Sequence, residues 1–582
     1  MRIHVLNARL YRTCWLIAGV ALIVSLLTLE SPSRGPEPAL PSSIDGAGVL
    51  TLSERIGAVA PERPAGSEGD LAAARMVQNQ FAQLPGMGSK VQVQDFVARI
   101  GDRRVPLQNV YLAVPGQSGG SARAGVLVVA PRDTPRGVAA GTSSTAILLS
   151  LARQSATTRH LRPHLFVSTD GNTIGQAGMR WFLRSFSGIE ISSGLVIDGL
   201  GDNAGDQGHL WARGMDNRHS LQIARRAAAA VTRAGGRPVA NPGLSDQLLG
   251  LAVPQTLGDQ GAAIAAGIPA VTLSARPDSP LRAGAAPTAE RLSIGANAAA
   301  DLLNVLDQPD QVGDPDASLE LAGRIVRPTV ARLVLLLLLL PVLVGAVEAA
   351  APSRRKGWLR DALRPTTARI VAVVVVLFAA HLMSLFNLWP QSAAGAPPQP
   401  QDVPFGWGPL LGAALVGVLF AGLRLRVRRP RRVLEGQAPV ALLVLAGALL
   451  ALWLVSPFAL LLALPAAHLV LVAGQVSRVW HVRLLALAGV LPLVLLAANV
   501  AAGLDRNLLF AAWYLLDTTA SGARGVWGPL LGAVILGALW ALATFAGDRA
   551  HEVAHPSGGP TRRRPRLRLS VERVPVGRRR HR

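Results

Sequence analysis

The chain has 582 residues, of which 50% are hydrophobic, and a mean hydropathy of +0.35. This composition argues against a soluble protein and favours a membrane protein with more than one domain. The net charge of +23 is carried almost wholly by arginine, because Lys90 and Lys356 are the only lysines. The single cysteine, Cys14, excludes an internal disulfide.

The first 30 residues predict a membrane anchor. Arg2, Arg9 and Arg12 precede an apolar run over residues 15–29, and no small-x-small cleavage site follows that run. This pattern predicts an uncleaved signal anchor, a transmembrane helix within residues 1–30. The Pro- and Ser-rich residues 31–44 predict an extended linker.

Residues 45–315 predict an α/β domain. Apolar segments typical of strands, such as AGVLVVAPRD, HLFVSTD and SGLVIDGLG, alternate with helical segments such as TSSTAILLSLARQ and GQAGMRWFLRSF. This alternation predicts a mixed, largely parallel sheet flanked by helices. In such a sheet we expect functional residues at the C-terminal ends of the strands.

Residues 327–547 predict a bundle of seven transmembrane helices. The candidate spans are residues 330–347, 370–388, 407–423, 440–455, 458–472, 484–502 and 527–545. With the anchor they make eight spans, and the loops on one side are then all rich in arginine. Because positive residues are retained in the cytoplasm, we expect a multi-pass plasma-membrane protein with both termini cytoplasmic and the α/β domain extracytoplasmic.

The basic residues 548–582 predict a cytoplasmic tail. Clustered arginines attract phosphates, but no folded nucleic-acid-binding motif accompanies them. We expect this tail to contact anionic lipid headgroups, and we expect no nucleic acid as a partner.

The bundle has two further sequence features. WGPLLGA occurs at residues 407–413 and again at 527–533, which indicates either a parallel duplication or independent use of a Trp anchor beside small packing residues. His381 and His468 are isolated within apolar runs. We expect them to be packed or interfacial and not a proton relay, which disfavours an ion-coupled carrier.

Five short segments follow one another between residues 52 and 306: RPAGSEG, NVYLAVPG, STAILLSLAR, FVSTDGNTIGQAG and GIPAVTL. They resemble segments of the M28 family of zinc-dependent aminopeptidases. The order of domains along the chain is one membrane span, then the α/β domain, then a bundle of several spans. This order also resembles that of M28-like membrane proteins, which include the peptidase-like subunit of the GPI transamidase. The resemblance implies an M28 peptidase-like fold. In active members two zinc ions are held by histidines and acids, and a glutamate activates the bridging water.

The resemblance also locates the catalytic positions of the family, and most of them hold other residues here. A zinc histidine is replaced by Pro131, the bridging aspartate by Ala140, the paired glutamates by Asn172 and Thr173, and the late histidine by Ala283, whereas the orienting aspartate Asp133 and the ligand Asp198 remain. We therefore expect no zinc, no other cofactor and no catalytic residue in this domain.

The polar residues at the strand ends are candidates for binding a ligand in the substrate cleft that the resemblance implies. They are Asp133, Asp170, Asn172 and Asp198. The three acids are expected either to pair with Arg132 or Arg180 as part of the scaffold, or to face an open cleft as a recognition surface.

Two alternative sites deserve comparison with this interpretation. A relocated metal site would use His209 and His219 with Asp202, Asp206 and Asp216, although this segment is more simply a polar loop. A nucleophile at Ser143 or Ser144 would need a histidine partner, and no G-x-S-x-G motif is present.

The sequence leaves three hypotheses for function. The first is a pseudo-peptidase that binds a polypeptide or partner subunit in a membrane complex. The second is an active M28-like hydrolase with a non-standard site. The third is a membrane carrier or lipid-handling protein with a regulatory outer domain. The expected partners are other membrane or extracytoplasmic proteins or peptides, and membrane lipids.

Overall fold

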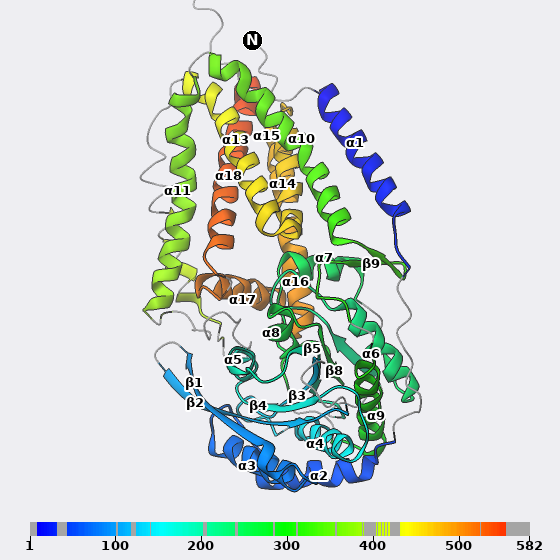
Figure 1. Ribbon diagram of the computed structural model, residues 1–582. Coiled ribbons are helices and arrows are strands. Elements are labelled where there is room, and N and C mark those ends of the chain that lie inside the picture. Colours follow the sequence, from blue (N-terminus) through cyan, green and yellow to red (C-terminus); the bar gives the residue numbers. More distant parts are fainter. Residues whose placement is uncertain are drawn as a thin grey trace, which may run out of the picture.

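A computed structural model describes most of the chain. The described residues are 8–31, 43–100, 103–117, 124–139, 141–201, 207–238, 242–282, 286–309, 312–355, 358–386, 388, parts of 403–418, 431–523 and 525–554. An α/β domain lies at one end of the molecule, and a bundle of long helices lies at the other (Figure 1).

The domain is built on an eight-stranded mixed sheet with the order β1-β2-β4-β3-β5-β8-β6-β7. Its strands are β1 (Val91–Ile100), β2 (Arg103–Val114), β3 (Gly125–Pro131), β4 (His164–Thr169), β5 (Ile191–Asp198), β6 (Gln207–Trp211), β7 (Arg237–Pro238) and β8 (Ala270–Ser274). The central strands β4, β3, β5 and β8 run parallel, whereas β2 and β6 join them antiparallel. The observed sheet confirms the fold class predicted from the sequence.

Helices cover both faces of the sheet. They are α2 (Gly46–Val59), α3 (Glu68–Ala82), α4 (Thr142–Thr157), α5 (Ala177–Ser185), α6 (Leu221–Arg233), α8 (Gln260–Ala265) and α9 (Ala289–Leu306). A further helix, α7 (Leu244–Ala252), packs against the helical region instead of the sheet. Every residue of β3 is buried, as expected for a parallel strand covered on both faces.

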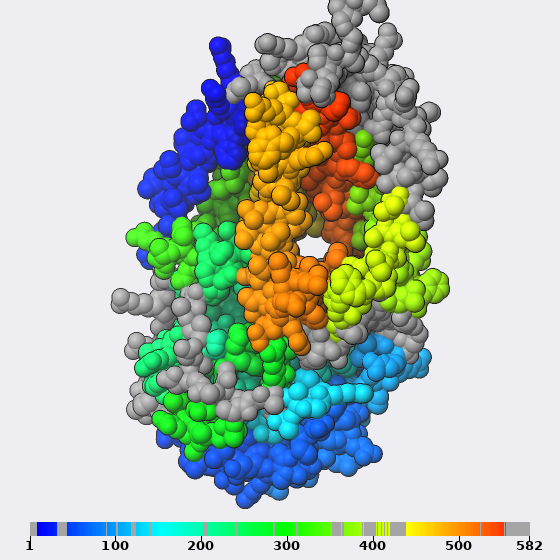
Figure 2. Space-filling model, turned by 180° about the vertical axis from the view of Figure 1, so that it is seen from behind, coloured from blue at the N-terminus to red at the C-terminus, as the bar shows by residue number. Residues whose placement is uncertain are grey.

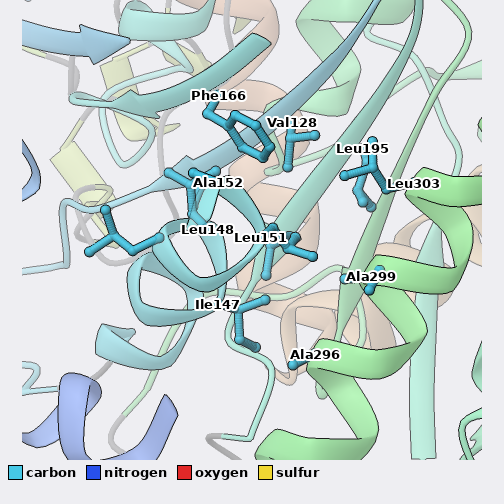
Figure 3. Close-up of a cluster of buried hydrophobic side chains, with 14 of the residues drawn as sticks. Val128, Ile147, Leu148, Leu151, Ala152, Phe166, Leu195, Ala296, Ala299 and Leu303 are labelled. Atoms are coloured by element: carbon cyan, nitrogen blue, oxygen red, sulfur yellow. The ribbon is translucent and has the colours of Figure 1, made fainter. Parts of the chain in front are cut away.

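Alternate residues of β3 belong to two cores. Val126 and Val128 pack in the larger core, which includes side chains of α4 and α9 (Figure 3). Leu127 and Val129 pack in the smaller core with α5 and α8. The alternation follows from the two-residue period of a strand, which sends successive side chains to opposite faces.

The helical region contains α1 (Ala8–Leu27), α10 (Pro328–Arg355), α11 (Trp358–Leu385), α13 (Arg431–Val455), α14 (Leu460–Ala473), α15 (Val479–Ala488), α16 (Leu491–Leu504), α17 (Leu508–Ala520) and α18 (Trp527–Ala554). Six helical stretches among the described residues are long and apolar enough to cross a membrane: Arg9–Leu27, Pro328–Ala351, Thr366–Leu385, Ala438–Val455, Val479–Leu504 and Trp527–His551. These six stretches are consistent with a membrane protein.

The helices differ from the eight expected spans at two places. About half of a further expected span, 407–423, lies outside the described residues, as does most of the expected linker and tail. The expected span at 458–472 corresponds to α14, which has 14 residues and is shorter than a full crossing. The connection between the last two expected spans, residues 503–526, contains α17, which lies across the upright helices next to the α/β domain (Figure 1).

Candidate functional site

The ends of three parallel strands bring the predicted site residues to one edge of the sheet. Asp133 follows β3, Asp170 follows β4, and Asp198 is the last residue of β5. The turn after β4 requires Gly171, whose φ of +79° lies in the left-handed region. This turn points the backbone N–H groups of Asn172 and Thr173 at the end of β3.

Asp133 is fully engaged by that turn. Its Oδ1 accepts a hydrogen bond from the Asn172 N–H at 2.9 Å, and its Oδ2 accepts from the Thr173 N–H at 2.8 Å and from the Thr173 hydroxyl at 2.6 Å. Burial, and then the charge of Asp170, raise the pKa of Asp133 to about 6. Asn172 and Thr173, at the positions where the resemblance implies glutamates, therefore bind Asp133.

Asp198 forms an ion pair with an arginine from the end of the neighbouring strand. Arg276 Nη2 lies 2.7 Å from Asp198 Oδ2, and both side chains are largely buried. The Arg276 guanidinium also stacks over the Trp211 ring at 4.8 Å. The partners expected from the sequence were Arg132 or Arg180, so for Asp198 that expectation is corrected: Arg276 reaches it because β8 lies directly beside β5.

Asp170 belongs to a buried cluster around Arg132. Arg132 Nη2 lies 2.8 Å from Asp70 Oδ2 and 3.6 Å from Asp170 Oδ2, and all three side chains are inaccessible to solvent. Burial raises the pKa of Asp70, and burial together with the charge of Asp70 raises the pKa of Asp170 to about 8. Asp70 lies in the first turn of α3, so this cluster joins that helix to the ends of β3 and β4.

Sequence reasoning missed a fourth acid at this edge, Asp259. The Thr169 hydroxyl donates to Asp259 Oδ2 at 2.6 Å, and in its satisfied orientation the Asn172 side-chain amide donates to Asp259 Oδ1 at 3.1 Å. Burial is the main cause that raises the pKa of Asp259 to about 7. The only available signal was its place before α8, eight residues ahead of the start of the GIPAVTL segment.

The space left between these groups is small. A cavity of about 20 Å³ remains, lined by residues that include Asp133, Asn172, Thr173, Asp198 and Arg276. Such a volume holds about one water molecule. No histidine is among the described residues that line it.

The remaining predicted positions are placed as follows. Pro131 ends β3 and lines this cavity. Ala140 and Ala283 lie outside the described residues. Ser144 is buried, and its Oγ accepts a hydrogen bond from the Gly199 N–H at 2.6 Å. Ser143 is also buried in the first turn of α4.

The proposed relocated metal site does not assemble among the residues that the structure describes. His209 lies in β6, His219 is buried in the loop that follows, and Asp216 is ion-paired with Arg218. They form no common ligand group, while Asp202 and Asp206 are outside the described residues.

A different group of metal-binding residue types occurs at the opposite end of β4. His160, His164 and Asp307 are buried, with potential ligand atoms within 4.8 Å of one another. However, the two imidazole rings stack at 4.1 Å with planes only 13° apart. Nearly parallel rings do not aim their in-plane lone pairs at one ion. Asp307 instead accepts hydrogen bonds from the N–H groups of Leu161 and Arg162, so we interpret the cluster as structural.

Comparisons with known proteins give similarity only among solved structures. No family model matches the chain, and no curated protein does. A glutaminyl cyclase from an Acidobacteriales bacterium has 17% identity and a TM-score of 0.37, and the match covers 48% of this chain and 100% of that one. An aminopeptidase from Aneurinibacillus sp. strain AM-1 has 13% identity and a TM-score of 0.36, covering 46% and 95%. A leucine aminopeptidase precursor from Bacteroides thetaiotaomicron VPI-5482 has 12% identity and a TM-score of 0.37, covering 47% and 99%.

These similarities are to a glutaminyl cyclase and two aminopeptidases, and they extend over about half of this chain. At such identities and TM-scores they carry no argument about activity or ligand. The fold class rests on the observed sheet, and the interpretation of the site rests on its own contacts.

Proposed function

We propose that this protein is a membrane-anchored pseudo-peptidase, whose M28-like domain binds a polypeptide or partner subunit in a membrane complex and cleaves no peptide bond. The observation that carries the proposal is that other residues of the chain already bind the retained acids. Asn172 and Thr173 donate hydrogen bonds to Asp133, and Arg276 forms an ion pair with Asp198. The resemblance in plan to the peptidase-like subunit of the GPI transamidase supports a non-catalytic role as a subunit. The distribution of arginines supports an extracytoplasmic position for the domain.

The residues present do not fit a pair of zinc ions. Zinc needs several imidazole or carboxylate groups with free lone pairs. Asp133 already accepts three hydrogen bonds, and a cation at Asp198 would meet the positive charge of Arg276 at close range. The water-activating glutamate of the family is replaced by an amide or a hydroxyl, neither of which is a base near neutral pH.

Metal content and hydrolysis test the catalytic part of the proposal. The full chain, purified in mild detergent, is expected to contain no stoichiometric zinc and to hydrolyse no aminoacyl substrate, with or without added zinc. About two tightly bound zinc ions per chain, with hydrolysis that chelation abolishes, would show a working metallopeptidase instead.

The edge strand β1 supports a polypeptide as the partner. It has ten residues and pairs with β2 on one side, and no described strand lies on its other side. Its free edge presents backbone donors and acceptors that another strand can pair with. Val97 of β1 is 56% exposed, and Phe96 stacks with the Trp181 ring at 5.5 Å.

The matched substitutions Val97→Lys and Val59→Lys test this edge. Val59 is 57% exposed but lies on α2, away from the strand. A partner cross-linked to the wild-type chain should be lost from Val97→Lys and retained by Val59→Lys. Equal recovery with all three chains would exclude β1 as the contact.

A further inference from the structure

A large cavity lies where the helical region meets the α/β domain. Its volume is about 780 Å³, within the roughly 300–1,000 Å³ range of small-molecule sites. The walls come from α13, α14, α15, α16 and α18, and one end is formed by the loop after α7, residues 252–256. Figure 2 shows an opening between the orange α16–α17 segment and the red α18, whose residues line the cavity.

The walls of the cavity are apolar. Leucine, valine, isoleucine, alanine and glycine make up most of the lining, and Leu493, Leu536 and Trp540 are among the larger side chains. Polar side chains gather near the α/β domain, where Asn217 Nδ2 donates to Ser456 Oγ at 2.8 Å. An apolar cavity does not retain water, so its chemistry fits a hydrocarbon chain with a polar group at one end.

The second copy of the WGPLLGA repeat helps to keep this space open. Trp527, Gly528, Pro529 and Gly532 all line the cavity. A Cβ added at Gly528 or at Gly532 would meet no other atom within 4 Å. The small residues of the repeat therefore face empty volume, which explains them better than helix packing does.

We propose that this cavity binds one acyl chain of a glycerophospholipid from the surrounding bilayer. Three of the candidate membrane spans contribute to its walls: residues 438–455 in α13, residues 479–504 across α15 and α16, and residues 527–551 in α18. A lipid chain is the apolar molecule that such helices meet. The polar end near Ser456 suits the ester region of a lipid. The inference goes beyond the proposed function and does not depend on it.

Filling the cavity tests the inference. Gly532→Phe should fill the space without a backbone clash, because nothing lies near its Cβ. Gly447→Phe is the matched control, since Gly447 also lies in a long apolar helix with no atom within 4 Å of an added Cβ, but does not line the cavity. All three chains are purified in a mild detergent, washed extensively, and extracted for lipid mass spectrometry, with thermal midpoints confirming that each is folded.

The expected result is intact phospholipid near one per chain in the wild type and in Gly447→Phe, and a loss of at least about fivefold in Gly532→Phe. Equal retention by all three chains, or no lipid on the folded wild type, would overturn the proposal. Recovery of free fatty acid alone would overturn the assignment to a phospholipid.

A second measurement does not depend on the variants. A phosphatidylcholine with a diazirine in its acyl chain is incorporated into vesicles with the wild-type chain and activated by light. Adducts at Leu493 and Leu536 are expected. Adducts confined to outward-facing residues such as Leu454 would contradict an internal site.

Discussion

At the scale of single residues, the acids at the edge of the sheet are held by other residues of the chain. The acids that remain would repel one another if all were charged and unpaired. Each acid instead contacts other groups of the chain. Asp198 forms an ion pair with an arginine, Asp133 accepts hydrogen bonds from a turn, and Asp259 accepts hydrogen bonds from a hydroxyl and an amide. These contacts stabilise the scaffold.

The Asp198–Arg276 pair is expected to be structural. Asp198→Ala leaves a largely buried guanidinium without its carboxylate, which should cost on the order of 3 kcal/mol and lower the thermal midpoint of the full chain. Asp216→Ala is the control, because Asp216 and Arg218 are about one-third exposed and such pairs contribute about 0–1 kcal/mol. Thermal unfolding in detergent measures both. Equal midpoints for Asp198→Ala and the wild type would show that Asp198 is free to bind a ligand.

Asp259 is expected to make stability depend on pH. Its pKa is raised from an ordinary value near 4 to about 7, so between these values the folded state keeps a proton that the unfolded state releases. The contribution of Asp259 to stability is therefore greatest at the acidic end and falls as the pH rises towards 7, by up to a few kcal/mol. Asp133, whose pKa is about 6, contributes in the same direction.

Asp259→Asn removes one titrating group while its amide oxygen can still accept from Thr169. Denaturation at pH 5 and pH 8 should show a smaller loss of stability in this variant than in the wild type. Asp95→Asn, at an exposed position on β1, should behave like the wild type. An unchanged slope in Asp259→Asn would mean that Asp259 is ionised throughout.

At the scale of elements, the turn after β4 and the start of α5 are packed together with almost no spare room. A Cβ at Gly178 would lie 2.2 Å from the Asp170 carbonyl oxygen and 2.6 Å from Asn109 Oδ1. This close approach holds the turn that satisfies Asp133. The segment STDGNTIGQAG therefore keeps its glycines for geometric reasons that are independent of catalysis.

Gly178→Ala is expected to destabilise the domain by about 1–3 kcal/mol or more, because backbone must move to admit the methyl group. Gly447→Ala, in α13, should be neutral or stabilising by about 0.5–1 kcal/mol, because alanine favours a helix and meets no neighbour. Chemical denaturation of the two variants measures the difference. Equal effects would indicate that the turn relaxes freely.

The sequence predicted the central elements well for a physical reason. The buried strands β3, β4 and β5 and the helices between them carry strong local patterns, and local pattern largely determines such elements. The ends of the helices were harder to predict. For example, α5 begins at Ala177 because Gln176 adopts a left-handed φ of 59°. The break between α15 and α16, near Gly489, was also missed within one apolar run.

The contacts of the site were harder to predict than its elements. Arg132 meets an aspartate 62 positions away, Arg276 meets one 78 positions away, and Thr169 meets one 90 positions away. Such contacts depend on how the helices and strands are arranged in space. The local sequence pattern does not determine that arrangement, so it does not predict the contacts. The residues at the positions where the resemblance implies metal ligands could be read from the sequence, but the partners Asp70, Asp259 and Arg276 could not.

At the scale of the whole molecule, the α/β domain and the helical region are joined by more than the chain. Asn217 bonds to Ser456, Asn499 Nδ2 donates to Asp246 Oδ1 at 2.7 Å, and Arg282 pairs with Asp505 at 2.5 Å. Leu257 also packs with Trp513 and Tyr514 of α17. The loop after α7 contributes Thr256 to the apolar cavity and Leu257 to the small cavity beside Asp198, so one loop separates the two spaces.

The orientation of the molecule in the membrane is the last prediction, and it follows from charge. In Figure 1 the start of α1 and the end of α18 both lie at the end of the bundle away from the α/β domain. The basic segments predicted to be cytoplasmic adjoin this end, and arginines resist transfer across a bilayer, so the α/β domain should be external.

Cysteine labelling tests this orientation in a Cys14→Ser background. Suitable positions are Glu62, which is exposed on the α/β domain, and Val553, which is 57% exposed near the end of α18. A membrane-impermeant maleimide applied to intact cells should label Glu62→Cys, and should label Val553→Cys only after permeabilisation. The reverse pattern would place the domain in the cytoplasm, and labelling of both positions in intact cells would mean that the two ends of the molecule share one side of the membrane.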